Sequence, residues 1–258
     1  MHVSCCSAKT TETIQKRCFM LVNSYRKLRV ASRQLLGTEP VVLVEKKLLI
    51  EFHGNDYCGW SIPVGHLGSN SVVVDVGLGE DISFSRSLIQ KYGCTVHGFD
   101  PTPRAIHYVK QLADPKVVLH EFGVAAQRGQ ATFYLPNNDA HVSGSLALAS
   151  HVGQRAIEVS LITLEDIFKL LGAERINLLK LDIEGAEFDL IDDDHFKDCA
   201  GRIDCLCIEF HHRWSNFGKV STLKAVQRLR ELGFRCAWRA KSTNEEFMFV
   251  NISSRGVQ

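Results

Sequence analysis

From residue 71 onward, runs of apolar residues alternate with segments whose apolar positions recur every three or four residues. The runs have the length and near-continuous hydrophobicity of strands buried on both faces of a sheet. They lie at residues 71–75, 95–99, 117–122, 176–182 and 203–210. Strands that alternate with helices form right-handed βαβ units, so we expect an α/β fold with a mostly parallel sheet.

Amphipathic segments fill the intervals between these strands. The best delimited segment begins at Thr163, which has capping-box spacing to Asp166, and ends at Gly172 after its last apolar position. Asp166 takes the place of the Glu or Gln that usually completes such a box. Two further helical stripes consist of Phe84, Leu88, Ile89 and Tyr92, and of Ile106 and Val109.

Two features interrupt the simple alternation. Segments 130–136 and 157–162 have strand character and bracket a polar loop at 137–154, which we expect to help shape a substrate pocket. At the end of the chain, segments 234–240 and 246–251 are joined by a short polar turn. They predict an antiparallel hairpin that completes the sheet.

The N-terminal part of the chain follows a different pattern. Residues 9–36 are basic, poor in acids and compatible with a helix, which suits a solvated cap helix or an organellar presequence. Residues 41–52 are rich in β-formers and predict a strand or hairpin. We therefore divide the chain into an N-terminal cap over 1–56 and an α/β domain over 57–258.

The composition is that of an ordinary globular protein, with 258 residues, 45% hydrophobic and 23% charged. A formal net charge of only +1 does not favour nucleic acid as a partner. No apolar run approaches the roughly 20 residues that span a bilayer. The chain has nine cysteines, an odd number without a C-x-x-C pair, so we expect reduced thiols and a cytoplasmic location.

The first strand ends in Asp75 and runs into a turn with Gly77 and Gly79. In open α/β sheets such turns let a ligand approach the backbone. A dinucleotide site would favour a third glycine at residue 81 or 82, but the turn continues with Glu80 and Asp81, whose carboxylates repel a diphosphate. S-adenosylmethionine, with its sulfonium and ammonium groups, suits this turn better, and Asp75 could hold the ammonium directly or through water.

The second strand ends in Phe99 and Asp100. A carboxylate at the end of this strand can accept hydrogen bonds from both ribose hydroxyls of a nucleoside. The alternative role of Asp100 is to cap the helix that follows it. Phe99 could lie beside the adenine or belong to the core.

Acidic and histidine side chains cluster after the fourth and fifth strands. The fourth is followed by Asp182, Glu184 and Glu187, and the fifth ends in Glu209 and 211-HH-212. Because strand ends of a parallel sheet meet at one edge, Asp182, Glu184, Glu209 and one histidine should surround one crevice. Glu187 could instead belong to a cluster at a helix N-terminus.

At these residues the sequence resembles the FkbM-type methyltransferases, a branch of the class I S-adenosylmethionine-dependent enzymes. The resemblance covers roughly residues 57–251. It is most specific in LKLDIEGAE at 179–187 and IEFHHR at 208–213, and extends to 57–63, 73–84, 99–103, 163–167 and the terminal hairpin. It implies a Rossmann-like sheet of seven strands, with the cofactor over the first two strands and the acceptor over the fourth and fifth.

The family mostly methylates hydroxyl groups of sugars and secondary metabolites, so the resemblance implies a small-molecule or carbohydrate acceptor. The sequence departs at Glu80, where many class I enzymes keep a small residue. The resulting prediction for the cofactor site is Asp75, Gly77, Gly79, Glu80, Phe99, Asp100 and Asp182, with S-adenosylmethionine as the cofactor.

Methyl transfer to a hydroxyl requires alignment and a base. We expect Asp182, Glu184, Glu209 and His211 to be catalytic. Of the two histidines, His211 rather than His212 should face the crevice. The base is either His211 or one of the carboxylates. A divalent ion at this cluster would be an alternative, but no ligand spacing indicates one, so we expect no metal. The rival functions are a nicotinamide-dependent oxidoreductase and a non-catalytic binding protein of the same fold.

Overall fold

The centre of the molecule is a seven-stranded sheet with the order β11-β12-β10-β9-β3-β4-β5. The computed structural model describes residues 21–136 and 152–253. The strands of this sheet are β3 (Val72–Val76), β4 (Thr95–Phe99), β5 (Val117–His120), β9 (Ile176–Leu181), β10 (Ile203–Glu209), β11 (Phe234–Arg239) and β12 (Glu246–Asn251). The five apolar runs and the terminal hairpin predicted from the sequence are thereby confirmed.

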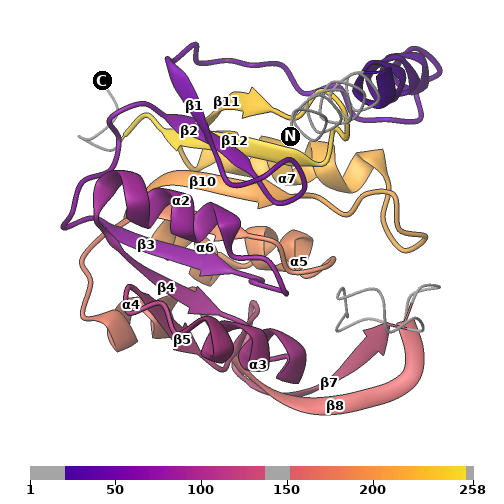
Figure 1. The fold of residues 1–258 in the computed structure, drawn as a ribbon. Coiled ribbons are helices and arrows are strands. Elements are labelled where there is room, and N and C mark those ends of the chain that lie inside the picture. The colour runs from indigo at the N-terminus through magenta and orange to yellow at the C-terminus, as the bar shows by residue number, and fades with distance from the viewer. Residues whose placement is uncertain (1–20, 137–151, 254–258) are drawn as a thin grey trace, which may run out of the picture.

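Four of the neighbouring strand pairs are parallel, and β12 runs antiparallel to both of its neighbours, β10 and β11. The sheet is therefore mostly parallel and ends in an antiparallel hairpin, as predicted. The carboxyl ends of β3, β4, β9 and β10 all lie at one edge of the sheet (Figure 1). This edge is where a doubly wound sheet binds its ligands.

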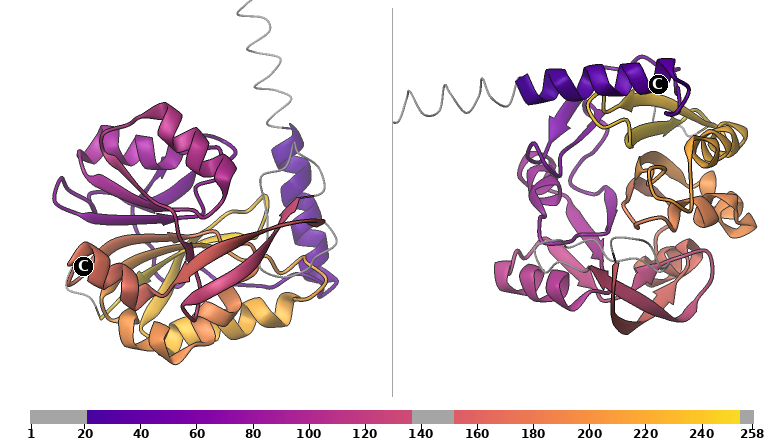
Figure 2. Two further views of the ribbon diagram at one scale, coloured as in Figure 1. Left: turned by 90° about the horizontal axis from the view of Figure 1, so that it is seen from below. Right: turned by 90° about the vertical axis from the view of Figure 1, so that its right-hand side faces the viewer.

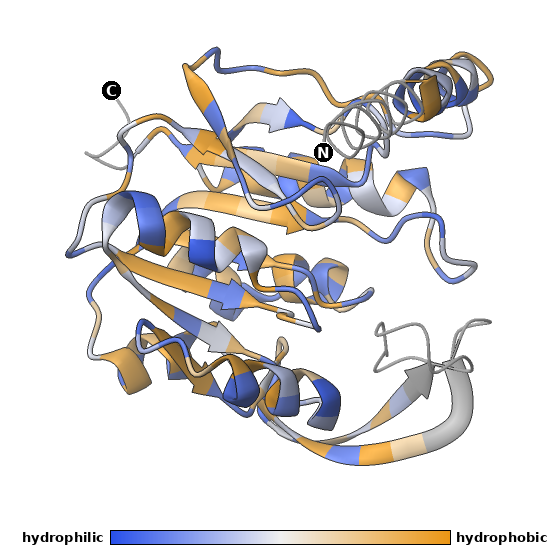
Figure 3. Cartoon of the chain, viewed as in Figure 1, coloured by the Kyte–Doolittle hydropathy of each residue, from blue (hydrophilic) through white to orange (hydrophobic). Residues whose placement is uncertain are grey.

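Helices cover both faces of the sheet. In Figure 1, α2 (Ser83–Tyr92) and α3 (Pro103–Leu112) lie in front of it, and Figure 2 shows the remaining helices on the opposite face. These are α4 (Leu164–Leu171), α5 (Glu187–Asp192), α6 (Asp194–Ala200) and α7 (Lys219–Glu231). Alternate residues of each strand pack against the two layers, as Val74 and Leu179 do on one side and Val73 and Leu178 on the other. Figure 3 shows the resulting apolar interior strands.

The helix α4 begins after Thr163 and ends before Gly172, as the sequence predicts. The Thr163 hydroxyl accepts from the Asp166 backbone N–H, the Asp166 carboxylate accepts from the Thr163 N–H, and Gly172 ends α4 in the left-handed conformation. The spacing of apolar residues in the sequence does not predict α5, α6 or α7. The first two span only six and seven residues, and the buried stripe of α7 includes Thr222 and Ala225, which carry a weak apolar signal.

The N-terminal part contains a helix at residues 21–35 and the hairpin of β1 (Ile50–His53) and β2 (Trp60–Pro63). The strand prediction for 41–52 was too long, because only its last residues join a strand. In the earlier part, Glu45 and Lys46 instead donate from their backbones to the Cys236 carbonyl. The β1–β2 hairpin extends across the predicted boundary between residues 56 and 57 and packs on α2 and β12.

A smaller sheet projects beside the main one (Figure 1). It consists of β6 (Gly123–Val124), β8 (Val152–Ile162) and β7 (Gly129–Pro136), so the two extra predicted strands are confirmed. Residues 137–151 of the predicted polar loop, and the first twenty residues of the predicted cap, lie outside the described residues. Among the helices of the described chain, none is long and apolar enough to cross a membrane.

Candidate active site

Two adjoining cavities open at the carboxyl edge of the sheet. The first, of about 330 Å³, is lined by the turn after β3 and the ends of β4 and β9. The second, of about 1380 Å³, lies between the N-terminal helix, the β1–β2 hairpin and the ends of β10 and β11. The residues that line both cavities are Tyr57, Cys58, Gly59, Asp182, Glu184, Glu209 and Glu246. The shared wall is thus mostly acidic.

The glycine turn after β3 forms one side of the smaller cavity. Gly77 has a φ of +81°, and a Cβ at this position would lie 1.9 Å from the Asp182 carbonyl oxygen. Only glycine therefore permits the ends of β3 and β9 to approach so closely. Gly79 also has a left-handed φ, +56°, and no atom lies within 4 Å of where its Cβ would be. Its backbone is open to a ligand.

Asp75 is paired inside the protein with a residue that the sequence analysis did not assign to the site, Lys180. The two face each other on neighbouring strands, with Lys180 Nζ 3.3 Å from Asp75 Oδ1, and Lys180 also donates to the Gly77 carbonyl at 2.6 Å. Burial lowers the pKa of Lys180, but the carboxylates of Asp75 and Asp182 raise it by a larger amount. The net shift of this pKa is upward, so the ammonium stays charged. The other Asp75 oxygen accepts from Ser85.

Asp100 does not cap α3, whose N-cap is Thr102 without a side-chain capping bond, but its carboxylate holds Thr102 and faces the smaller cavity. Its Oδ1 accepts from the Thr102 backbone at 2.9 Å and from the Thr102 hydroxyl at 2.6 Å. Its Oδ2 accepts from the Gly79 N–H at 3.0 Å. The carboxylate therefore fixes the turn to the start of α3 and keeps further acceptor capacity on the cavity side.

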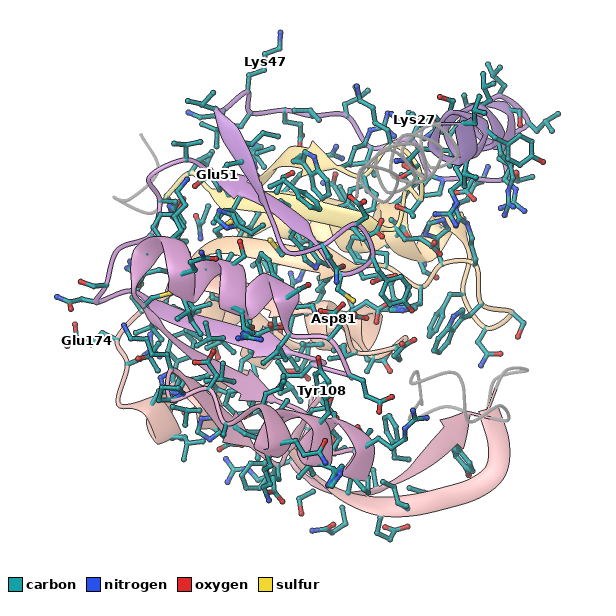
Figure 4. All side chains as sticks on the ribbon, viewed as in Figure 1. Lys27, Lys47, Glu51, Asp81, Tyr108 and Glu174 are labelled. Atoms are coloured by element: carbon teal, nitrogen blue, oxygen red, sulfur yellow. The ribbon has the colours of Figure 1, made fainter. Side chains whose placement is uncertain are left out.

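The acidic residues at the start of α2 differ in their contacts. Glu80 pairs with Arg104. Asp81 accepts from the Ser83 backbone N–H at 2.8 Å and from the Asn55 amide at 2.6 Å, which ties the β1–β2 hairpin to the helix start (Figure 4). Both carboxylates line the smaller cavity and make it electronegative.

Phe99 is fully buried and stacks on His120 with ring centroids 4.4 Å apart, although its position borders the smaller cavity. The apolar end of this cavity is completed by Phe122 and Val124, which the sequence analysis did not assign to the site. Phe122 follows β5, whose predicted range of 117–122 was two residues too long, and Val124 lies in β6. Apolar residues just beyond the end of a parallel strand were the signal available for finding them.

The turn after β9 positions a histidine among carboxylates. Glu187 is fully buried, and its Oε1 accepts from the backbone N–H of His211 at 2.8 Å and lies 3.1 Å from His211 Nδ1. On the other side of the ring, His211 Nε2 lies 3.1 Å from Glu184, 3.8 Å from Asp182 and 4.0 Å from Glu209. The structure thus brings together all four of the predicted catalytic residues, and Glu187 orients the ring.

The carboxylates set the charge of this cluster. Burial lowers the pKa of His211, but its hydrogen bonds to Glu184 and Glu187 raise it by a larger amount. The resulting pKa lies well above the ordinary histidine value. Burial, followed by the like charge of Asp182, raises the pKa of Glu209 well above the ordinary carboxylate value. His211 is therefore shifted toward its protonated form and Glu209 toward its neutral form.

The neighbouring histidine belongs to a different network. His212 Nε2 lies 2.8 Å from the buried carboxylate of Glu39, which also accepts from Arg213 at 2.8 Å and from Asn244 at 3.2 Å. Burial raises the pKa of Glu39, but the hydrogen bonds from Arg213, His212 and Asn244 lower it to about 2. This network fixes the N-terminal segment to the end of β10 and to the β11–β12 turn.

Glu39→Gln should lower the free energy of unfolding by about 2–3 kcal/mol at pH 7, because a pKa lowered from 4.5 to about 2 stabilises the folded state above the unfolded pKa. That stability is lost as the pH falls from 4.5 toward 2, so the difference between variant and wild type should shrink on acidification. Chemical denaturation at several pH values measures this. A difference that is independent of pH would contradict the role of the Glu39 charge.

Three of the site residues are also close enough to share a cation. One ligand atom from each of Asp182, Glu184 and His211 lies within 4.8 Å of the others. Carboxylate oxygens and an imidazole could hold a divalent metal, although exposed acidic groups often adopt such arrangements without one.

Comparisons with known proteins point to one family. The model of the methyltransferase FkbM domain matches residues 68–236, which is more than half of the chain. A search of curated proteins finds no significant match.

Solved structures that resemble the chain do so at low identity. They include a fibrillarin pre-rRNA processing protein of Methanococcus jannaschii (10% identity, 72% of this chain and 69% of that chain, TM-score 0.44). A fibrillarin of Aeropyrum pernix in complex with S-adenosyl-L-methionine is similar at 7% identity, 73% and 68% coverage and a TM-score of 0.42. An rRNA methylase of Streptococcus thermophilus shares 15% identity, with 71% and 86% coverage and a TM-score of 0.41. On the strength of the family match, the chain belongs to the FkbM methyltransferases.

Proposed function

We propose that this protein transfers a methyl group from S-adenosylmethionine to a hydroxyl group of an uncharged acceptor, a sugar or another small metabolite. The observation that carries the proposal is the acidic wall shared by the two cavities. A donor in the smaller cavity and an acceptor in the larger one would meet at Asp182, Glu184 and Glu209. These are the groups that can align a hydroxyl and receive its proton.

The smaller cavity suits the donor. Its volume of about 330 Å³ is in the range of small-molecule sites. The open backbone at Gly79 and the carboxylate of Asp100 would hold the nucleoside, and Phe122 and Val124 offer an apolar wall for its base. When bound, S-adenosylmethionine supplies an electrophilic methyl group on a sulfonium. The acidic start of α2 complements a cationic ligand and disfavours a diphosphate.

The larger cavity suits a neutral hydroxylated acceptor. Aromatic side chains line it, those of Phe52, Tyr57, Trp214 and Trp238. Aromatic rings offer apolar faces for the non-polar side of a sugar ring, while carboxylates accept from its hydroxyls. The carboxylates of Asp182, Glu184 and Glu209 oppose a phosphate next to the reacting hydroxyl, whereas the cations of this cavity lie on other lining residues, Arg26, Lys27, Arg239 and Lys241.

Within the wall, the pKa directions assign distinct roles. The shift of His211 toward its protonated form, which cannot remove a proton, favours a carboxylate as the base, and Glu209 suits the role because its pKa is raised from the ordinary carboxylate value toward neutral pH. Glu209 would take the hydroxyl proton as the oxygen attacks. His211, oriented by Glu187, would stabilise the negative charge that develops on that oxygen.

Two rival functions are less well supported. A nicotinamide oxidoreductase would bind a diphosphate, which Glu80 and Asp81 oppose. A non-catalytic binding protein would not require open cavities on both sides of a buried acid and histidine cluster. Methyl transfer from labelled S-adenosylmethionine across a panel of sugars, hydroxylated metabolites and RNA tests the proposal. Labelling of RNA alone, or binding of a nicotinamide cofactor instead, would overturn it.

Asp100→Ala should weaken the binding of S-adenosylmethionine by about 1–3 kcal/mol, as expected for the loss of charge-assisted hydrogen bonds. Isothermal calorimetry measures the affinity. Thr102→Val is the matched control, because it removes only the hydroxyl that donates to Asp100 Oδ1 and leaves the carboxylate in place. Equal affinities of wild type and Asp100→Ala would contradict the assignment of Asp100 to the nucleoside.

A further inference from the structure

The N-terminal helix at residues 21–35 lies on the outside of the molecule, beside the β11–β12 hairpin (Figures 1 and 2). Its second half is fastened to the rest of the chain. Val30 is 5% exposed, Gln34 donates to the Pro40 carbonyl at 3.0 Å, and Arg33 pairs with Glu39 at 3.3 Å. The helix is therefore held in one orientation, with Val30 toward the protein.

The opposite side of this helix is apolar. Leu21, Tyr25, Leu28 and Leu35 are spaced by four, three and seven residues, which puts them on one helix face. They are 72%, 66%, 71% and 90% exposed, respectively. A helix on a globular protein normally turns its apolar face to the core, so this helix is inverted: its apolar stripe faces away from the protein.

Basic residues border the apolar stripe. At 100° per residue, Arg29 lies next to the stripe on one flank, Arg26 lies further round the same flank toward the side of Val30, and Lys27 lies on the other flank. Figure 4 labels Lys27 on this helix. No acidic residue occurs in the sequence between Thr13 and Thr38, and within the described part of the chain no ion pair involves these three side chains. The outward helix face, defined as Leu21, Tyr25, Leu28 and Leu35 with these three flanking cations, thus combines apolar and cationic groups.

We propose that the outward helix face binds an anionic lipid surface. An exposed stripe of leucine and tyrosine flanked by arginine and lysine is the arrangement of helices that lie in the membrane interface, where the apolar side chains enter the acyl boundary and the cations meet the headgroups. A second copy of the chain fits less well, because a symmetric pair of these faces would oppose cations with cations. Nucleic acid would leave the leucines without a partner.

The helix that carries the outward helix face also borders the larger cavity. Arg26 and Lys27 lie at the border of that cavity as well as on the helix. Lipid binding would therefore hold the mouth of the larger cavity at the membrane surface. The binding of lipid does not depend on which methyl acceptor the larger cavity takes.

The test is sedimentation of the full chain with vesicles of phosphatidylcholine alone and with vesicles containing about one third phosphatidylserine. We expect binding to the second kind only, weakened by salt because surface charges are screened. The double variant Leu28→Gln/Leu35→Gln should lower the partition coefficient at least tenfold, and Arg29→Glu should lower it severalfold. These positions are exposed, so circular dichroism should give unchanged melting curves.

The matched control is Leu170→Gln/Val220→Gln, two apolar residues that are 52% and 55% exposed elsewhere on the surface. It should bind vesicles as wild type does. Failure of wild type to sediment with anionic vesicles, or equal binding by Leu28→Gln/Leu35→Gln, would overturn the proposal. So would a wild-type dimer in sedimentation velocity that this double variant converts to monomer, because the face would then serve self-association.

Discussion

Lys180→Met should lower the free energy of unfolding by about 3–5 kcal/mol, the largest loss of stability that we expect from a single substitution in this chain. The Lys180 ammonium is buried, with Nζ 3.3 Å from Asp75 and 3.6 Å from Asp182. Removal of one member of a buried pair leaves an uncompensated charge, which is costlier than the absence of the pair. For a chain of this size the melting temperature should fall by about 6–20 °C.

The double variant Lys180→Met/Asp75→Asn separates this cause from a loss of packing. A neutral amide at residue 75 removes the orphaned charge, so the double variant should recover part of the lost stability. Lys224→Met, at an exposed position on α7, is the matched control and should melt within a degree or two of wild type. If Lys180→Met has the same melting temperature as wild type, the Asp75 carboxylate does not need Lys180 to compensate its charge.

The strands and the edge where the site lies could be predicted because each depends on a local pattern. A strand buried on both faces appears as a continuous apolar run, and the glycines at 77 and 79 mark a turn whatever lies opposite them. Parallel strands have their carboxyl ends at one edge, so Asp182 and His211 could be assigned to one crevice without a structure. The pairing partners of these residues have no such local signature.

Lys180 shows why the pairing partners were missed. Within the run INLLKL it is a polar interruption of an apolar strand, and its role follows only from the register that puts it opposite Asp75. Glu39 is separated by 173 residues from His212, and no local pattern links them. Glu187 was ambiguous because a helix start and an active site both favour a carboxylate there, and here it begins α5 and also orients His211.

The charge states of His211 and Glu209 were harder to infer from the sequence than the pairing partners. A histidine beside acids was an obvious candidate for the base, but the structure adds the direction of each pKa. His211 is shifted up by Glu184 and Glu187 despite its burial, and Glu209 is shifted up by burial and by Asp182. The sequence left His211 or a carboxylate as the base, and the proposed choice of Glu209 depends on three-dimensional proximity, which residue types alone do not reveal.

Glu209→Gln should lower the turnover of methyl transfer by about 10²–10⁴-fold and leave the affinity for S-adenosylmethionine nearly unchanged, because a general base acts on the acceptor. The wild-type rate should be bell-shaped in pH. It should rise as Glu209 loses its proton, at a pH above the ordinary carboxylate range because its pKa is raised. It should fall as His211 loses its proton, above the ordinary histidine range for the same reason.

The variant Glu246→Gln distinguishes this assignment from a general loss of acidity in the wall. Glu246 lies opposite Glu209 in the register of β10 and β12, and its like charge is among the causes that raise the pKa of Glu209. Removing that charge should move the rising limb to lower pH while the maximal rate is retained. His212→Ala, which breaks a contact to Glu39, should lower stability without moving either limb. If Glu209→Gln keeps full turnover with both limbs while His211→Ala loses the rising limb, His211 is the base, and the carboxylates serve only to hold it.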